Sequence, residues 1–137
     1  MKLTVNVTYD ITPQRISDLF ASAFEGGINY WAQDAELTAT AAPMRSDLVW
    51  WGCPEHFEGP FVFELHYDDP DDDEGEGNGK GVKVIDNAAV IRGFEVMAAR
   101  APRHFSNFIT DDEDAETADV FVQCIVFADR DEPLIYG

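Results

Sequence analysis

The chain has little cysteine and no long hydrophobic run, and each shortage excludes a class of protein. Its two cysteines, Cys53 and Cys124, are too few for a disulfide framework. The chain does not begin with the charged and then apolar segment that is typical of a secretion signal. Its longest apolar runs are far shorter than the roughly 20 residues of a membrane span. We therefore expect a cytoplasmic protein with free thiols.

Positive charge is also scarce, and this leaves a large negative excess. The 137 residues include 27 Asp and Glu against 9 Lys and Arg, which gives a net charge of −18. A folded chain of this length is about 37 Å across. Over that distance the excess is one charge per ~2 Å, close to the one per ~1.7 Å of duplex DNA. Such a field repels nucleic acids and anionic membranes and attracts basic surfaces, so we exclude direct binding to either.

No catalytic, metal or cofactor site can be assembled from the sequence. Residues 69–80 match the first three ligand positions of an EF-hand loop, but Glu74 and Lys80 stand where that loop needs Gly and Glu. Cys53 and His56 have the spacing of half a zinc site, without a second close pair. We expect no metal and no cofactor, and we favour a binding protein over an enzyme.

Alternating and apolar runs predict strands in three places. Residues 3–9 and 61–67 alternate apolar and polar side chains, and residues 82–85 form a short apolar return. The acidic, glycine-spaced tract 68–81 lies between the last two runs, so a long hairpin is the simplest arrangement. Three prolines interrupt residues 32–60, and no element can be predicted there with a clear pattern.

Helices are predicted from their start signals. Thr12 followed by Pro13 begins one helix, which the glycines at 26–27 end. Asp86 caps a second, which Pro102 ends or kinks, with a short further helix through Phe105 and Phe108. Thr110 and Glu113 fit a capping box. The apolar run 120–128 then predicts a buried helix, although its β-branched residues leave a strand possible.

These elements predict a single α+β domain over the whole chain. Its length and its 45% of apolar residues suffice for one hydrophobic core. The expected fold is a small antiparallel sheet with a long acidic hairpin loop, packed against two or three helices.

Four segments carry a resemblance to a known family. They are residues 24–31 (FEGGINYW), 102–105 (PRHF), 114–124 (DAETADVFVQC) and 136–137 (YG). The chain resembles a family of small uncharacterised phage and prophage proteins with an EGGxNYW segment and a DAETADVFxQ segment near the C-terminus. The likeness is thin over residues 37–82. It implies a mobile element and the cytoplasm of a host cell, and it transfers no functional residues.

The acids concentrate in two tracts that supply 13 of the 27 carboxylates. If both tracts face the same way, a basic groove would meet two negative rows. With the phage-like resemblance, this predicts a DNA mimic that inhibits a nucleic-acid-binding host defence protein, such as a CRISPR or restriction nuclease. The candidate partner-binding residues are Asp68, Asp69, Asp71, Asp72, Asp73, Glu74, Glu76, Asp111, Asp112, Glu113, Asp114, Glu116 and Asp119.

Other interpretations remain open. One is a small ligand-binding or nucleotide-binding protein, or an enzyme, with a corner made of Glu25, Asn29, Tyr30 and Trp31. The simpler interpretation of that corner is a glycine helix end whose aromatics fold back onto the core. Another is a salt-adapted structural or interaction domain, in which the acids only hydrate the surface. Exposed tryptophans at 50 and 51 would favour a homodimer.

Overall fold

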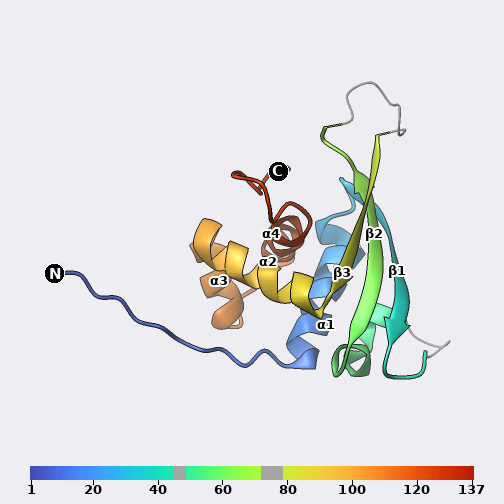
Figure 1. The fold of residues 1–137 in the computed structure, drawn as a ribbon, viewed down its shortest axis with the longest axis horizontal. Helices are drawn as coiled ribbons and strands as arrows, with labels where there is room; N and C mark the ends of the chain where they lie inside the picture. The colour runs from blue at the N-terminus through green and yellow to red at the C-terminus, as the bar shows by residue number, and fades with distance from the viewer. Residues whose placement is uncertain (45–48, 72–78) are drawn as a thin grey trace.

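The computed structural model describes residues 1–44, 49–71 and 79–137, in which a three-stranded antiparallel sheet is combined with four α-helices (Figure 1). The elements follow one another as α1 (Pro13–Ser22), a π-turn (Ala23–Gly27), β1 (Ala32–Thr40), two 3-10 turns (Trp50–Gly52 and Pro54–Phe57), β2 (Phe61–Asp68), β3 (Lys80–Asp86), α2 (Asn87–Arg100), α3 (Pro102–Ile109) and α4 (Ala115–Val126). The α+β prediction is confirmed, with one helix more than expected.

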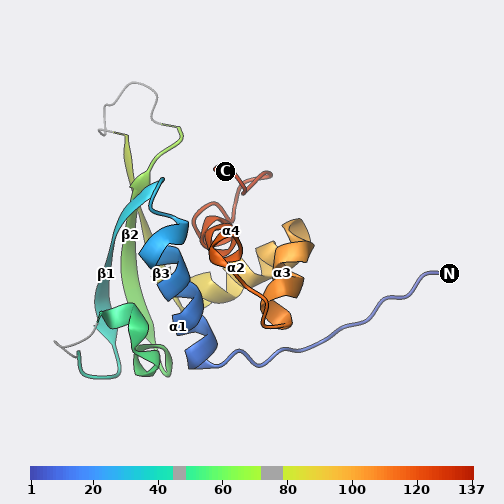
Figure 2. The same ribbon diagram turned by 180° about the vertical axis from the view of Figure 1, so that it is seen from behind.

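The sheet has the order β1-β2-β3, and both neighbouring pairs are antiparallel. The predicted hairpin is therefore confirmed as β2 and β3. On β2, Phe61, Phe63 and Leu65 are buried on the face that the helices cover. Figures 1 and 2 show the described helices on this side of the sheet only. The alternate residues of the strands lie on the opposite, uncovered face.

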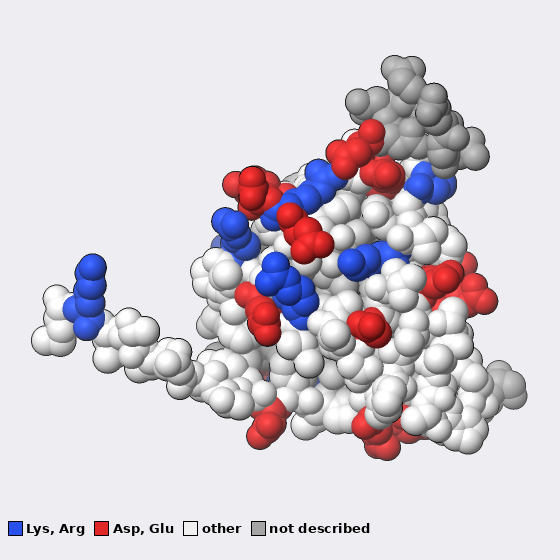
Figure 3. All heavy atoms as spheres, in the orientation of Figure 1, with Lys and Arg blue, Asp and Glu red and all other residues white. Residues whose placement is uncertain are grey.

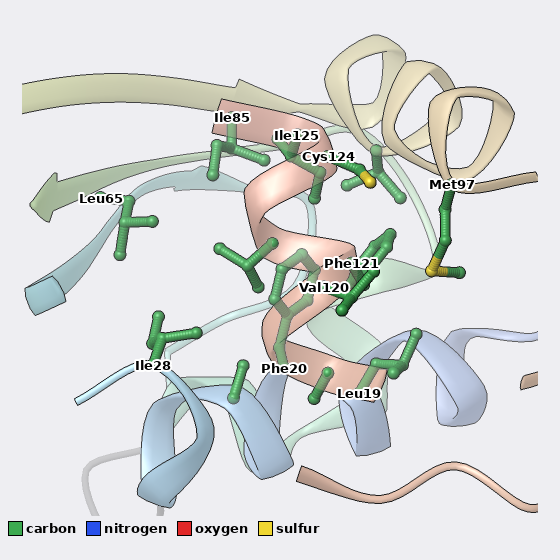
Figure 4. Close-up of a cluster of buried hydrophobic side chains, with 14 of the residues drawn as sticks. Leu19, Phe20, Ile28, Leu65, Ile85, Met97, Val120, Phe121, Cys124 and Ile125 are labelled. Carbon is green, nitrogen blue, oxygen red and sulfur yellow. The ribbon is translucent and has the colours of Figure 1, made fainter. Parts of the chain in front are cut away.

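Helix α4 is the centre of the core (Figure 4). Its residues 117–125 are all buried, which confirms the helical interpretation of the apolar run. The Phe121 ring stacks on Phe94 of α2 at 4.5 Å between centroids and lies 5.5 Å from Phe20 of α1. Gly93 allows α2 to come this close, because a Cβ there would lie 2.3 Å from Cγ1 of Ile125. The α2 backbone at Gly93 thus packs directly against the Ile125 side chain of α4.

The predicted starts of the first two helices are confirmed. The Thr12 hydroxyl oxygen accepts a hydrogen bond from the Arg15 amide at 3.2 Å, directly before Pro13. The Asp86 carboxylate accepts one from the Ala89 amide at 2.9 Å. Each side chain thus satisfies an amide that the first helical turn leaves without a partner.

The predicted capping box at Thr110 is wrong. Thr110 follows the end of α3, and its hydroxyl donates back to the Ser106 carbonyl oxygen. The N-cap of α4 is Asp114, whose carboxylate accepts from the Thr117 amide at 2.9 Å. Asp111 between them has a left-handed backbone with a φ of 62°. The chain therefore turns before α4 begins.

The predicted strand at residues 3–9 is also wrong. Residues 1–10 form an extended, exposed segment that leaves the body of the molecule before α1 (Figures 1 and 2). The side chains alternate as in a strand, but no neighbouring strand pairs with them among the described residues. The first strand of the sheet is instead β1, in the region that gave no clear pattern.

Candidate functional site

The described acids of the two tracts lie near opposite ends of α4. Asp114 lies at the start of α4, whereas Asp71 forms an ion pair with Arg130, four residues beyond its end. Twelve helical residues separate these positions by about 18 Å. The arrangement of the two tracts as adjacent negative rows stays a prediction. Asp72, Asp73, Glu74 and Glu76 lie outside the described residues.

The described acids at the hairpin end are partly bonded within the protein. The Asp68 carboxylate accepts a hydrogen bond from Lys80 Nζ at 2.9 Å, and this bond lowers the pKa of Asp68. Asp71 is paired with Arg130. The Asp69 amide donates to the Gly79 carbonyl oxygen at 2.7 Å, where the strands diverge. Local cations therefore reduce the negative field at this end.

The acids between α3 and α4 surround Arg15 of α1. Its guanidinium lies 3.7 Å from Asp111 and 3.4 Å from Glu113, and it also donates to the Phe108 carbonyl oxygen. The Thr117 amide lowers the pKa of Asp114 by hydrogen bonding to its carboxylate. The other two acids of this group, Asp112 and Glu116, have exposed side chains. This group stabilises helix ends as much as it presents charge.

Asp119 is not a surface residue, which corrects its place among the partner-binding candidates. It lies on the buried helix α4 and is 9% exposed. Its carboxylate accepts hydrogen bonds from the Tyr30 hydroxyl at 2.6 Å, Trp31 Nε1 at 2.8 Å and Gln123 Nε2 at 2.9 Å. Three donors satisfy a charge that would otherwise be costly to bury.

This hydrogen-bonded cluster joins residues 24–31, 114–124 and 136–137. Gln123 Oε1 accepts from the amides of Ile135 and Tyr136 at 2.8 and 2.9 Å. The Tyr136 ring stacks on Trp31 at 5.2 Å. The segment 102–105 reaches the same helix through His104, whose Nδ1 lies 3.1 Å from the Thr117 hydroxyl. All four segments therefore meet around α4 and serve its packing.

The expected ligand corner does not converge on one cavity. Trp31 is fully buried and its N–H bonds Asp119, so its ring belongs to the core. The Tyr30 hydroxyl is used in the same way, and burial together with the Asp119 bond raises the pKa of Tyr30. Glu25 and Asn29 are exposed. The hollow beside Asn29 holds about 70 Å³, well below the roughly 300 Å³ of a small-molecule site.

Several acids share the uncovered side of the sheet. We call this surface the acidic sheet face, and its acids include Asp34, Glu36, Glu64 and Asp68. His66, Lys80, Val82 and Val84 lie on the same face. Glu36 lies directly opposite Glu64 in the register, and Asp34 lies opposite His66. Like charges in directly opposed positions destabilise a sheet. Sequence analysis missed this face because two of its acids are on the unpredicted strand β1.

Charge elsewhere is mixed. Figure 3 shows acidic side chains on several parts of one side of the molecule, with Lys and Arg side chains between many of them. Arg92, Arg100 and Arg130 line a hollow of about 320 Å³ together with acids of α2 and the C-terminal segment. Acidic and basic side chains are therefore intermixed on this side of the molecule.

Cys53 and Cys124 are buried free thiols, and burial raises the pKa of Cys124 away from the reactive thiolate form. Within the described ranges, no three His, Cys, Asp or Glu side chains are grouped to hold a metal ion. None of the described helices is long and apolar enough to cross a membrane.

No family model, curated protein or solved structure matches the chain.

Proposed function

We propose that this protein is an acidic binding protein that occupies a cationic, nucleic-acid-binding surface of another protein, as a DNA mimic does. The observation that carries the proposal is the acidic sheet face, where Glu36 and Glu64 oppose each other on a surface that no described helix covers. The phage-like resemblance makes a host defence nuclease, of the CRISPR or restriction type, the partner class we propose.

The acids of this face are poorly balanced from within the protein. Lys80 neutralises Asp68 at 2.9 Å, and His66 lies 3.7 Å from Glu64. No ion pair between described residues involves Asp34 or Glu36. A partner that brings Arg or Lys against this face would relieve the repulsion between opposed carboxylates and form charge-assisted hydrogen bonds.

The rest of the molecule adds a long-range contribution. Asp119 is the only buried acid among the described residues, so nearly all of the described negative charge faces solvent. A net charge of −18 steers such a protein toward basic clefts and speeds association. The same field disfavours direct contact with DNA or RNA.

The test is displacement of labelled duplex DNA from a purified restriction endonuclease and from a guide-loaded CRISPR nuclease, followed by fluorescence anisotropy. The double variant Glu36→Gln with Glu64→Gln should weaken displacement by about tenfold, since one lost charge-assisted contact costs about that much. Displacement should also weaken as salt rises, because the attraction is screened.

The matched control is Glu25→Gln with Glu95→Gln, which removes the same charge from exposed positions outside the sheet. Its displacement should change by no more than about twofold. An equal loss in both double variants would show that total charge matters and the sheet face does not. Failure to displace DNA from either nuclease, or displacement that persists in molar salt, would contradict the proposal.

A further inference from the structure

The extended segment of residues 1–10, which we call the arm, exposes a row of apolar side chains. Leu3, Val5 and Val7 are 84%, 67% and 59% exposed, and they alternate with Thr4 and other polar residues. Such regular exposure of branched apolar side chains is unfavourable in water. It is the pattern of a strand that has one apolar face.

The arm is almost unattached to its own body. Among the hydrogen bonds between described residues, none involves residues 1–11. At the base of the arm, Tyr9 packs edge-on against Phe105 at 5.6 Å between ring centroids. Residues 3–9 include neither Gly nor Pro, so their backbone groups are free to pair in a sheet.

The sheet offers a matching edge at β3. Because the order is β1-β2-β3, β3 has one side on which no strand of the described residues lies. Val82 and Val84 are 53% and 54% exposed beside this edge. The other edge is partly closed, since Trp50 Nε1 donates to the Ala35 carbonyl oxygen of β1 at 3.0 Å. An open edge with exposed apolar side chains is a template for another strand.

We infer that the arm adds to the β3 edge of a second copy of this chain, so that two copies exchange arms. Residues 3–9 match β3 in length, at seven residues. Antiparallel alignment over this length places Val5 beside Val84 and Val7 beside Val82, on one face of the sheet. Reciprocal exchange closes a two-fold dimer with the same contact made twice.

Charge supports a second copy as the occupant. The arm carries Lys2 and no acid before Asp10, whereas the whole chain has a net charge of −18. The arm is therefore attracted to a copy of the acidic body. The bodies themselves repel, and the tether of residues 10–12 keeps them within about 10 Å of the exchanged strand. Dimerisation should strengthen as salt screens this repulsion, opposite to the salt dependence of the proposed function.

Cysteine cross-linking tests the contact directly. Separately purified Val5→Cys and Val84→Cys proteins, mixed at high salt under mild oxidation, should form a disulfide-linked heterodimer. The native Cys53 and Cys124 are buried and do not compete. The matched control, Thr4→Cys mixed with Val84→Cys, places the thiol on the opposite face of the arm and should cross-link far less.

Other cross-linking patterns would overturn the inference. Predominant Val5→Cys homodimers would mean that arms pair with each other. A monomeric disulfide in the dilute double variant would mean that the arm folds onto its own chain. Yields equal to those of the Thr4→Cys control would mean that no specific exchange occurs.

Sedimentation supplies a second readout. The unmodified chain should shift from monomer to dimer as protein concentration and salt rise. Val5→Asn should raise the dimer dissociation constant by about tenfold or more, because a valine side chain is no longer buried. Thr4→Asn should change it by no more than about twofold. A chain that stays monomeric at every concentration and salt would overturn the inference.

Discussion

Among single residues, Asp119 is the centre of a buried hydrogen-bonded cluster that reaches the C-terminal segment through Gln123. Its carboxylate accepts from Tyr30, Trp31 and Gln123, and Gln123 in turn binds the backbone of Tyr136. Asp119→Ala leaves three donors without this acceptor. We expect it to lower the free energy of unfolding by about 3 kcal/mol, measured by urea denaturation.

Asp112→Ala is the control for this substitution, since Asp112 is exposed and lies in the same acidic tract. We expect a change within about 0.5 kcal/mol. A loss for Asp119→Ala as small as this would mean that the three donors find other partners, and the buried cluster would not have the structural role described.

The burial of Asp119 could not be predicted from local charge, because it follows five exposed or half-exposed acids. A different signal was present. Thr117, Asp119 and Gln123 are the buried polar residues of a helix whose other buried residues are apolar. Polar side chains in an otherwise buried helix must be hydrogen-bonded internally. That pattern, with the aromatics at 30–31, identifies the cluster better than the count of acids does.

Among the elements, α4 depends on its start. Asp114→Ala removes the N-cap and should cost about 1 kcal/mol in the free energy of unfolding near neutral pH. Because the Thr117 amide holds the pKa of Asp114 below its usual value, the carboxylate stabilises the fold above about pH 4, and this contribution is lost as the pH falls through the lowered pKa. The difference between variant and parent, from urea denaturation, should shrink in acid.

Thr110→Ala tests the alternative start of the same helix. If Asp114 is the cap, Thr110→Ala costs no more than about 0.5 kcal/mol. Were Thr110 the more sensitive of the two, the helix would begin earlier than Ala115. The capping-box pattern misled because its spacing was right while the backbone at Asp111 turns the chain away.

Helices were predicted better than strands because their signals are local. Thr12 and Asp86 cap their helices through bonds to residues three positions away. A strand needs a distant partner, and pairing cannot be read from one segment. Residues 3–9 have an ideal strand pattern and no partner among the described residues. Strand β1 instead pairs with β2, with two register shifts, although its buried side chains are small or only half covered.

The candidate site was likewise predictable only where its signal is local in the sequence. The acidic hairpin was predicted correctly in sequence, as a tract between two pairing strands. The acidic sheet face was not, since it depends on the register that sets Glu36 opposite Glu64. Composition determines how much charge the molecule carries, and tertiary pairing determines where that charge is concentrated.

For the whole molecule, the question is whether the charge of −18 requires salt for folding. The core includes Phe20, Trp31, Phe63, Phe108 and Phe121, each nearly or fully buried, so apolar burial should outweigh self-repulsion. We expect a cooperative thermal unfolding transition even in dilute buffer, where the Debye length is about 30 Å. Its midpoint should rise as salt is added, because screening stabilises the compact state.

The double variant Glu36→Gln with Glu64→Gln distinguishes local from overall repulsion. Removing the opposed pair should raise the midpoint in dilute buffer and reduce its dependence on salt, more than the control Glu25→Gln with Glu95→Gln. Equal effects of the two double variants would show that the repulsion comes from the total charge. Absence of any cooperative transition in dilute buffer would favour a salt-adapted domain, because a protein that competes for a cationic cleft must already be folded when the attraction is strongest.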